Sequence, residues 1–121
     1  MTTRAGKIAW TVLLILAAGW TLNHLAGIFL YAGDTPRLVF VSFAAVDLAA
    51  TLVLLFPYRR HRQWAWLAIW AEVATIASVF FWADREIGAW YGAIAVLMAT
   101  AQLLTLREFS TSAPRRPVRN P

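Results

Sequence analysis

Five side chains that could bind a ligand or take part in chemistry lie inside long apolar stretches of this 121-residue chain: Trp20, Asn23, His24, Asp47 and Glu72. Ionisable side chains at the centre of a bilayer cost about 2.5–3.5 kcal/mol each on insertion scales, so they usually face a bundle interior or a cavity. Trp20, Asn23 and His24 follow the i, i+3, i+4 spacing of one helical stripe. We therefore expect these five residues to line a central polar pocket that binds a ligand.

The three ionisable groups are expected at similar depths. At 1.5 Å per helical residue, Asp47 lies roughly 15 Å and Glu72 roughly 16 Å from the same side of the membrane, and His24 roughly 10 Å. Two carboxyl groups at one depth cannot both ionise easily in a low dielectric, so at least one is expected to be protonated. The other could pair with a charged His24.

This set of residues supports several functions. An acid, a histidine and a tryptophan wall suit a small apolar or cationic ligand, through ion pairing and cation–π contact. The same groups could carry out acid–base chemistry on a lipid-like substrate, such as isomerisation of a double bond. A proton-coupled exporter could use Asp47 or Glu72 as its coupling acid. Polar groups between membrane helices can also serve packing alone.

Metal and cofactor chemistry are not expected. One histidine and two carboxylates resemble a metal-binding triad, but the chain has no local motif such as HExxH. Bis-histidine haem ligation would need a second histidine within the membrane. The chain has no cysteine, which excludes disulfides, iron–sulfur clusters and cysteine zinc sites. We expect neither a metal nor a cofactor.

The elements that position these residues are four apolar segments. Hydrophobic residues make up 60% of the chain and charged residues only 14%, about half the share of an ordinary soluble domain. The segments cover residues 8–31, 38–57, 65–83 and 88–106. Each is long enough to cross a bilayer and lacks the alternation of barrel strands. Because their connections are short, we expect an all-α polytopic membrane protein: an up-down four-helix transmembrane bundle over residues 1–109.

The basic residues indicate an orientation. Nine lie in the N-terminal segment, the middle connection and the C-terminal tail, against two, Arg37 and Arg85, in the other connections. This bias predicts a protein of the cell membrane with both termini on the cytoplasmic side. The net charge of +5 therefore reflects topology and does not indicate nucleic-acid binding. Residues 110–121 are rich in proline and arginine and should form a disordered, basic cytoplasmic tail.

Two further predictions concern packing. A stripe of small residues on the fourth segment, Gly88, Gly92, Ala95 and Ala99, should allow close helix approach and could join a second copy or another subunit. Gln102 at its end, like Asn23, is expected to serve mainly as a packing contact between helices. His61, in the basic middle connection, is expected to be solvated.

The motifs LNHLAG at residues 22–27 and AVDLAA at residues 45–50, together with the length, resemble small four-span bacterial membrane proteins of the DoxX-like kind. Four-span sterol-isomerase and sigma-2-receptor-like proteins also carry acids in their early helices around a lipid-facing pocket. This sequence lacks their set of motifs, so only the idea of a central acidic pocket containing Asp47 and Glu72 carries over. Small multidrug transporters share the size, but their key acid lies in the first helix. The favoured function is binding of an apolar or lipid-like ligand, or of a partner membrane subunit. An isomerase-like enzyme and an exporter are the alternatives.

Overall fold

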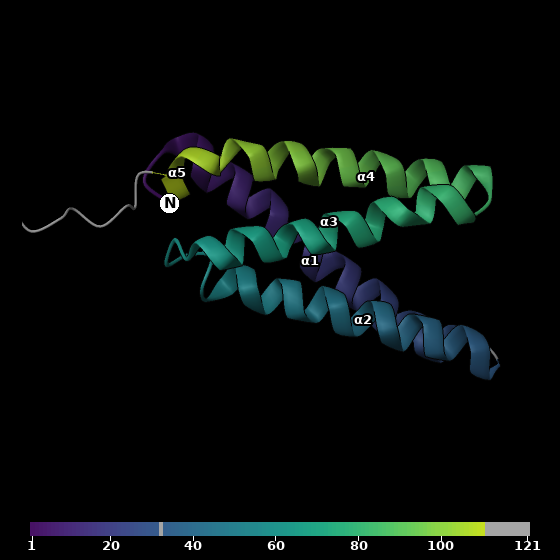
Figure 1. Cartoon of the computed structure of the whole chain (residues 1–121). Coiled ribbons are helices and arrows are strands. Elements are labelled where there is room, and N and C mark those ends of the chain that lie inside the picture. Colours follow the sequence, from purple (N-terminus) through teal and green to yellow (C-terminus); the bar gives the residue numbers. More distant parts are fainter. Residues whose placement is uncertain (32, 111–121) are drawn as a thin grey trace, which may run out of the picture.

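The computed structural model describes residues 1–31 and 33–110, and this part of the chain forms five helices (Figure 1). The helices are α1 (Arg4–Leu30), α2 (Asp34–Leu55), α3 (Gln63–Trp82), α4 (Arg85–Leu104) and the short α5 (Leu106–Ser110). Four helices are therefore found close to the four predicted segments, whereas α5 was not anticipated. The predicted tail lies outside the described residues except for Ser110, which ends α5.

All four long helices begin earlier than the predicted apolar segments, and in α1 and α4 a polar side chain caps the added first turn. The Thr3 side chain accepts a hydrogen bond from the Gly6 amide at the start of α1. The Asp84 carboxylate accepts from the amides of Glu86 and Ile87 at the start of α4. Such caps satisfy amides that have no partner within the helix. A pattern of apolar residues does not predict these first turns, because they contain polar residues.

The four long helices form two pairs of neighbours. α1 packs most extensively against α2, and α3 against α4, while α1 also contacts α4 and α2 contacts α3. Figure 1 shows α1 beginning beside α5 and ending beside α2. We call the end with residues 1–3, the connection 56–62 and α5 the terminal end. The end with the other two connections is the hairpin end.

The outside of the molecule is apolar. Phe29 is 83% exposed and Phe81 84% exposed, and many other large apolar side chains are exposed on all four long helices. Each of the four candidate spans, the last running from Arg85 to Ser110 through α5, is long and apolar enough to cross a membrane. A water-soluble protein of this size would not carry so much contiguous apolar surface. The fold is therefore compatible with a multi-pass membrane protein.

The small-residue stripe of α4 lies against α3 of the same chain. A Cβ atom at Gly88 would lie 3.2 Å from the Phe80 carbonyl oxygen, and one at Gly92 would lie 3.0 Å from the Phe80 ring. Gly88 and Ala95 are buried there. The close approach predicted for this stripe is thus found between α3 and α4, and its use as a subunit interface stays a prediction.

Candidate functional site

One polar side chain from each long helix contributes to a row across the interior, which we call the polar row. The row runs from Tyr91 on α4 to His24 on α1, then to Asp47 on α2 and Glu72 on α3. His24, Asp47 and Glu72 are each no more than 2% exposed. The three predicted ionisable residues are therefore neighbours in the fold, and Tyr91 is an additional member.

His24 links two helices through both of its ring nitrogens. Nδ1 lies 2.5 Å from Asp47 Oδ2, and Nε2 lies 3.1 Å from the Tyr91 hydroxyl. The pattern of α1 accounts for this position, because Thr21, His24 and Gly27 lie on its buried face at i, i+3, i+6 spacing. With the Asp47 carboxylate as the acceptor, the N–H group at Nδ1 donates the hydrogen bond.

The two carboxyl groups leave three oxygens without a hydrogen-bond partner. Glu72 lies close enough to Asp47 for the carboxyl groups to interact electrostatically. Among the described residues, however, Asp47 Oδ1 and both Glu72 oxygens accept and donate no hydrogen bond. Buried polar atoms are nearly always paired, and a proton shared between the two neighbouring carboxyl groups would pair two of these oxygens.

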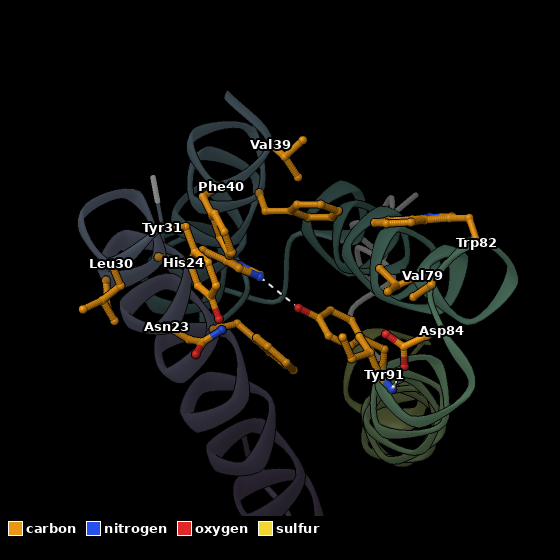
Figure 2. A pocket seen from close by; sticks show the side chains of 16 residues that line it. Asn23, His24, Leu30, Tyr31, Val39, Phe40, Val79, Trp82, Asp84 and Tyr91 are labelled. Carbon is orange, nitrogen blue, oxygen red and sulfur yellow. Dashed lines mark hydrogen bonds between the residues drawn. The ribbon is translucent and has the colours of Figure 1, made fainter. Parts of the chain in front are cut away.

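A cavity of about 610 Å³ lies at the hairpin end, between the α1–α2 and α3–α4 pairs (Figure 2). We call it the aromatic cavity, because six ring side chains line it together with His24. These are Trp20, Tyr31, Phe40, Phe43, Trp82 and Tyr91. Figure 2 shows the contact between Tyr91 and His24 spanning the space between the two helix pairs. One end of the polar row thus faces the aromatic cavity.

The predicted pocket residues are divided between two places. Trp20, Asn23 and His24 line the aromatic cavity, and the Trp20 ring stacks on His24 with centroids 5.2 Å apart. Asp47 does not line this cavity and reaches it only through His24. Glu72 instead lines a separate groove of about 350 Å³ between α2 and α3. The expected single central pocket is therefore a cavity and a groove joined by the polar row.

Tyr91 is not among the residues that the sequence predicts for the site. Its spacing held a usable signal, because Tyr91 lies three residues after Gly88 and four before Ala95, on the buried stripe of α4. Phe40 and Phe43 were also missed. Their rings lie 6.0 and 5.2 Å from His24, and no pattern distinguishes them from lipid-facing phenylalanines.

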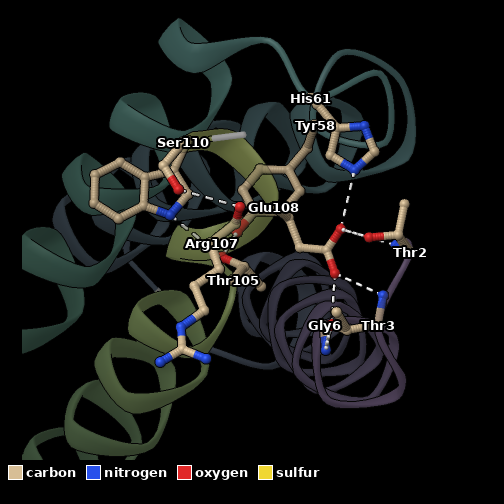
Figure 3. A network of polar contacts seen from close by, with 10 residues as sticks. Thr2, Thr3, Gly6, Tyr58, His61, Thr105, Arg107, Glu108 and Ser110 are labelled. Carbon is tan, nitrogen blue, oxygen red and sulfur yellow. Dashed lines mark hydrogen bonds and ion pairs between the residues drawn. The ribbon is translucent and has the colours of Figure 1, made fainter. Parts of the chain in front are cut away.

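A second polar network holds the terminal end together (Figure 3). The Glu108 carboxylate accepts hydrogen bonds from the amide and hydroxyl groups of both Thr2 and Thr3, at 2.5–2.8 Å. His61 Nε2 lies 3.6 Å from the same carboxylate, and His61 is 23% exposed. His61 was predicted to be solvated and is only partly so, because α5 folds back against the connection that contains it.

Gln102 belongs to this terminal end and serves packing, as expected. Its amide oxygen accepts from the Tyr58 hydroxyl at 2.8 Å, and its amide nitrogen donates to the Trp66 carbonyl at 2.6 Å. Tyr58 also contacts the Thr105 hydroxyl at 2.6 Å. This network ties the middle connection and α3 to the end of α4. It lies apart from the aromatic cavity, which none of these residues lines.

The arrangement is suited to proton exchange more than to metal binding. Among residues 1–31 and 33–110, no group of three histidine, aspartate or glutamate side chains could hold a metal ion. A phenol, an imidazole and a carboxylate in sequence can instead pass a proton and stabilise charge beside a bound ligand.

Comparisons with protein-family models, curated proteins and solved structures find no match to this chain. The resemblance to DoxX-like proteins therefore stays a prediction.

Proposed function

We propose that the protein crosses a cell membrane four times as an up-down bundle, with both termini in the cytoplasm. The four long apolar helices and their exposed apolar side chains support insertion. The excess of arginine and lysine at the terminal end supports this orientation. The aromatic cavity would then open toward the outer side of that membrane.

We further propose that the protein binds a small ligand in the aromatic cavity, with an apolar body and one polar group. The observation that carries this proposal is the combination of six aromatic walls with a polar end formed by Tyr91 and His24. Ligand cavities are typically apolar with a few placed polar groups, in the volume range found here. Asn23 offers a further hydrogen-bonding group on the wall.

The experiment combines native mass spectrometry with a binding titration. Mass spectrometry of the protein purified in mild detergent should show a retained small molecule. The titration uses 4-methylbiphenyl, a neutral rod-shaped probe. We expect saturable binding to the wild type and a loss of about tenfold in affinity for Trp20→Ala, which removes a stacking wall.

The matched control is Trp90→Ala. Trp90 lies on α4 but is 67% exposed and does not line the aromatic cavity. This variant should bind the probe like the wild type. Equal losses in both variants, or no saturable binding to the wild type, would show that the cavity is not a ligand site.

A second candidate function is acid–base catalysis on the bound ligand. It is favoured by the order of the row, in which Asp47 orients His24 and His24 contacts the Tyr91 hydroxyl. Tyr91 and His24 both line the cavity, so either could exchange a proton with a substrate, such as a lipid-like alkene. Tyr91→Phe separates the two candidates. It should abolish conversion of a retained molecule in an enzyme, but weaken affinity only severalfold in a binding protein.

A further inference from the structure

The polar row has features that binding of a neutral ligand does not need. Its far end holds two carboxyl groups, on α2 and α3, that are each 1% exposed. A neutral ligand in the aromatic cavity needs only the surface formed by Tyr91 and His24. The buried acids behind them therefore call for a function of their own.

The charged and titratable groups around this site come from all four helices. α1 contributes His24, α2 Asp47, α3 Glu72 and α4 Tyr91, and Tyr31 and Asp84 also line the aromatic cavity. Within the described residues, no lysine or arginine forms an ion pair with either buried carboxyl group. In the described part of the chain, His24 is the one basic side chain that contacts these acids.

Charge balance then limits the states of the site. Two neighbouring carboxylates in a low dielectric repel each other, so the pair retains one proton and carries a single negative charge. If His24 carries a proton on each ring nitrogen, its positive charge balances the carboxyl pair and the site is neutral. Without the proton on Nε2, the site has a net charge of −1.

Tyr91 fits both states of His24 without movement of the helices. Its hydroxyl can accept a hydrogen bond from a protonated Nε2 and can donate one to a deprotonated Nε2. The hydroxyl oxygen lies 3.1 Å from Nε2, and both residues line the aromatic cavity. A proton that leaves Nε2 therefore enters the cavity, by way of the Tyr91 hydroxyl.

We propose that the aromatic cavity binds an organic cation in exchange for one proton from the His24–Asp47–Glu72 group. Aromatic faces attract such cations, and six rings line the cavity. As the cation enters, the N–H bond at His24 Nε2 breaks, and the proton leaves through the cavity. The positive charge of the cation replaces that of the proton, so the interior stays neutral. Nothing is oxidised or reduced.

This inference rests on the proposed ligand binding, and its test is designed to separate the two. The probes are N-methyl-4-phenylpyridinium and 4-methylbiphenyl, which share one shape and differ in charge. Neither carries a titratable proton. Calorimetric titration in micelles, repeated in buffers with different ionisation enthalpies, gives the number of protons released per probe bound.

We expect the cation to release about one proton from the wild type and the neutral probe to release none. The double variant Asp47→Asn/Glu72→Gln keeps the shape of both side chains but removes their charge. It should release no proton, and its affinity for the cation should fall at least about tenfold relative to the neutral probe. The control is Glu86→Gln, a substitution of an exposed residue on α4, which should behave like the wild type.

The outcomes distinguish the proposals even if the double variant does not fold. In the wild type, release of one proton requires the affinity for the cation to rise about tenfold per pH unit. Cation binding without proton release, or binding of the neutral probe alone, would overturn the exchange while leaving ligand binding intact. Failure of both probes to bind would overturn both proposals.

Discussion

The contact between His24 and Asp47 makes a quantitative prediction about stability. We consider the single changes His24→Ala and Asp47→Ala and their combination. Each single change leaves the other group buried without its partner, since His24 is 2% and Asp47 1% exposed. Breaking a buried ion pair by removing one member costs about 3–5 kcal/mol. The double variant removes both members of the pair, so neither is left buried without the other, and we expect a coupling energy of about 3 kcal/mol between the two sites.

A neutral contact between the same helices provides the control. The hydroxyl groups of Thr21 on α1 and Thr51 on α2 lie 3.3 Å apart. Hydrogen bonds between membrane helices average about 0.6 kcal/mol and reach about 1.7 kcal/mol, so this pair should couple within that range. Both cycles can be measured by reversible unfolding in mixed micelles of increasing denaturing-detergent content. If His24 and Asp47 couple no more strongly than the two threonines, the row is ordinary helix packing and our charge argument fails.

The remaining predictions concern three glycines and one tyrosine. Gly6→Ala should lower the free energy of unfolding by about 2 kcal/mol, because its Cβ would lie 2.5 Å from Glu108 Oε1 and would displace the hydrogen bonds to Thr2 and Thr3. Gly19→Ala meets no atom within 4 Å and should be neutral or stabilising in the same unfolding assay. Gly27→Ala should weaken binding of 4-methylbiphenyl about fivefold, because its Cβ would lie 2.5 Å from the Phe40 ring in the cavity wall; an unchanged affinity would contradict this account. Burial raises the pKa of Tyr58 above its usual value, and a hydrogen bond with Thr105 offsets this in part. The unfolded chain therefore loses the tyrosine proton first, so stability should fall as the pH rises above about 10. Tyr58→Phe should remove that contribution, which unfolding at a series of alkaline pH values would show.

The sequence allowed the helices to be predicted because length and hydropathy are local properties. Each of the four long helices has a predicted segment within it or nearly so. The short helix α5 escaped prediction, since five residues with the sequence LREFS have no periodic pattern. Its position depends on Glu108 reaching Thr2 and Thr3 more than 100 residues earlier in the chain. Such a long-range contact has no local signature.

The site was predictable in its residue types and less so in its shape. An ionisable residue inside an apolar helix must find a partner, so the proximity of His24, Asp47 and Glu72 followed from depth and helical face alone. The separation of cavity from groove did not follow, because it depends on how far the two helix pairs diverge at the hairpin end. Tyr91 shows the same limit: its buried face could be derived, but the approach of its hydroxyl to His24 comes from the packing of α1 against α4.

The two ends of the molecule differ in a way that bears on ligand entry. The terminal end is held by several hydrogen bonds between distant segments, including those of Glu108 and those linking Tyr58, Trp66 and Gln102. At the hairpin end, the described contacts between the two helix pairs are mainly aromatic, such as Phe43 with Trp82 at 6.4 Å. Aromatic contacts can slide or separate at a lower cost than buried hydrogen bonds can be broken. Because the aromatic cavity lies at this end, the proposed ligand binding would require the helix pairs to part there, while the hydrogen bonds of the terminal end hold the four helices together.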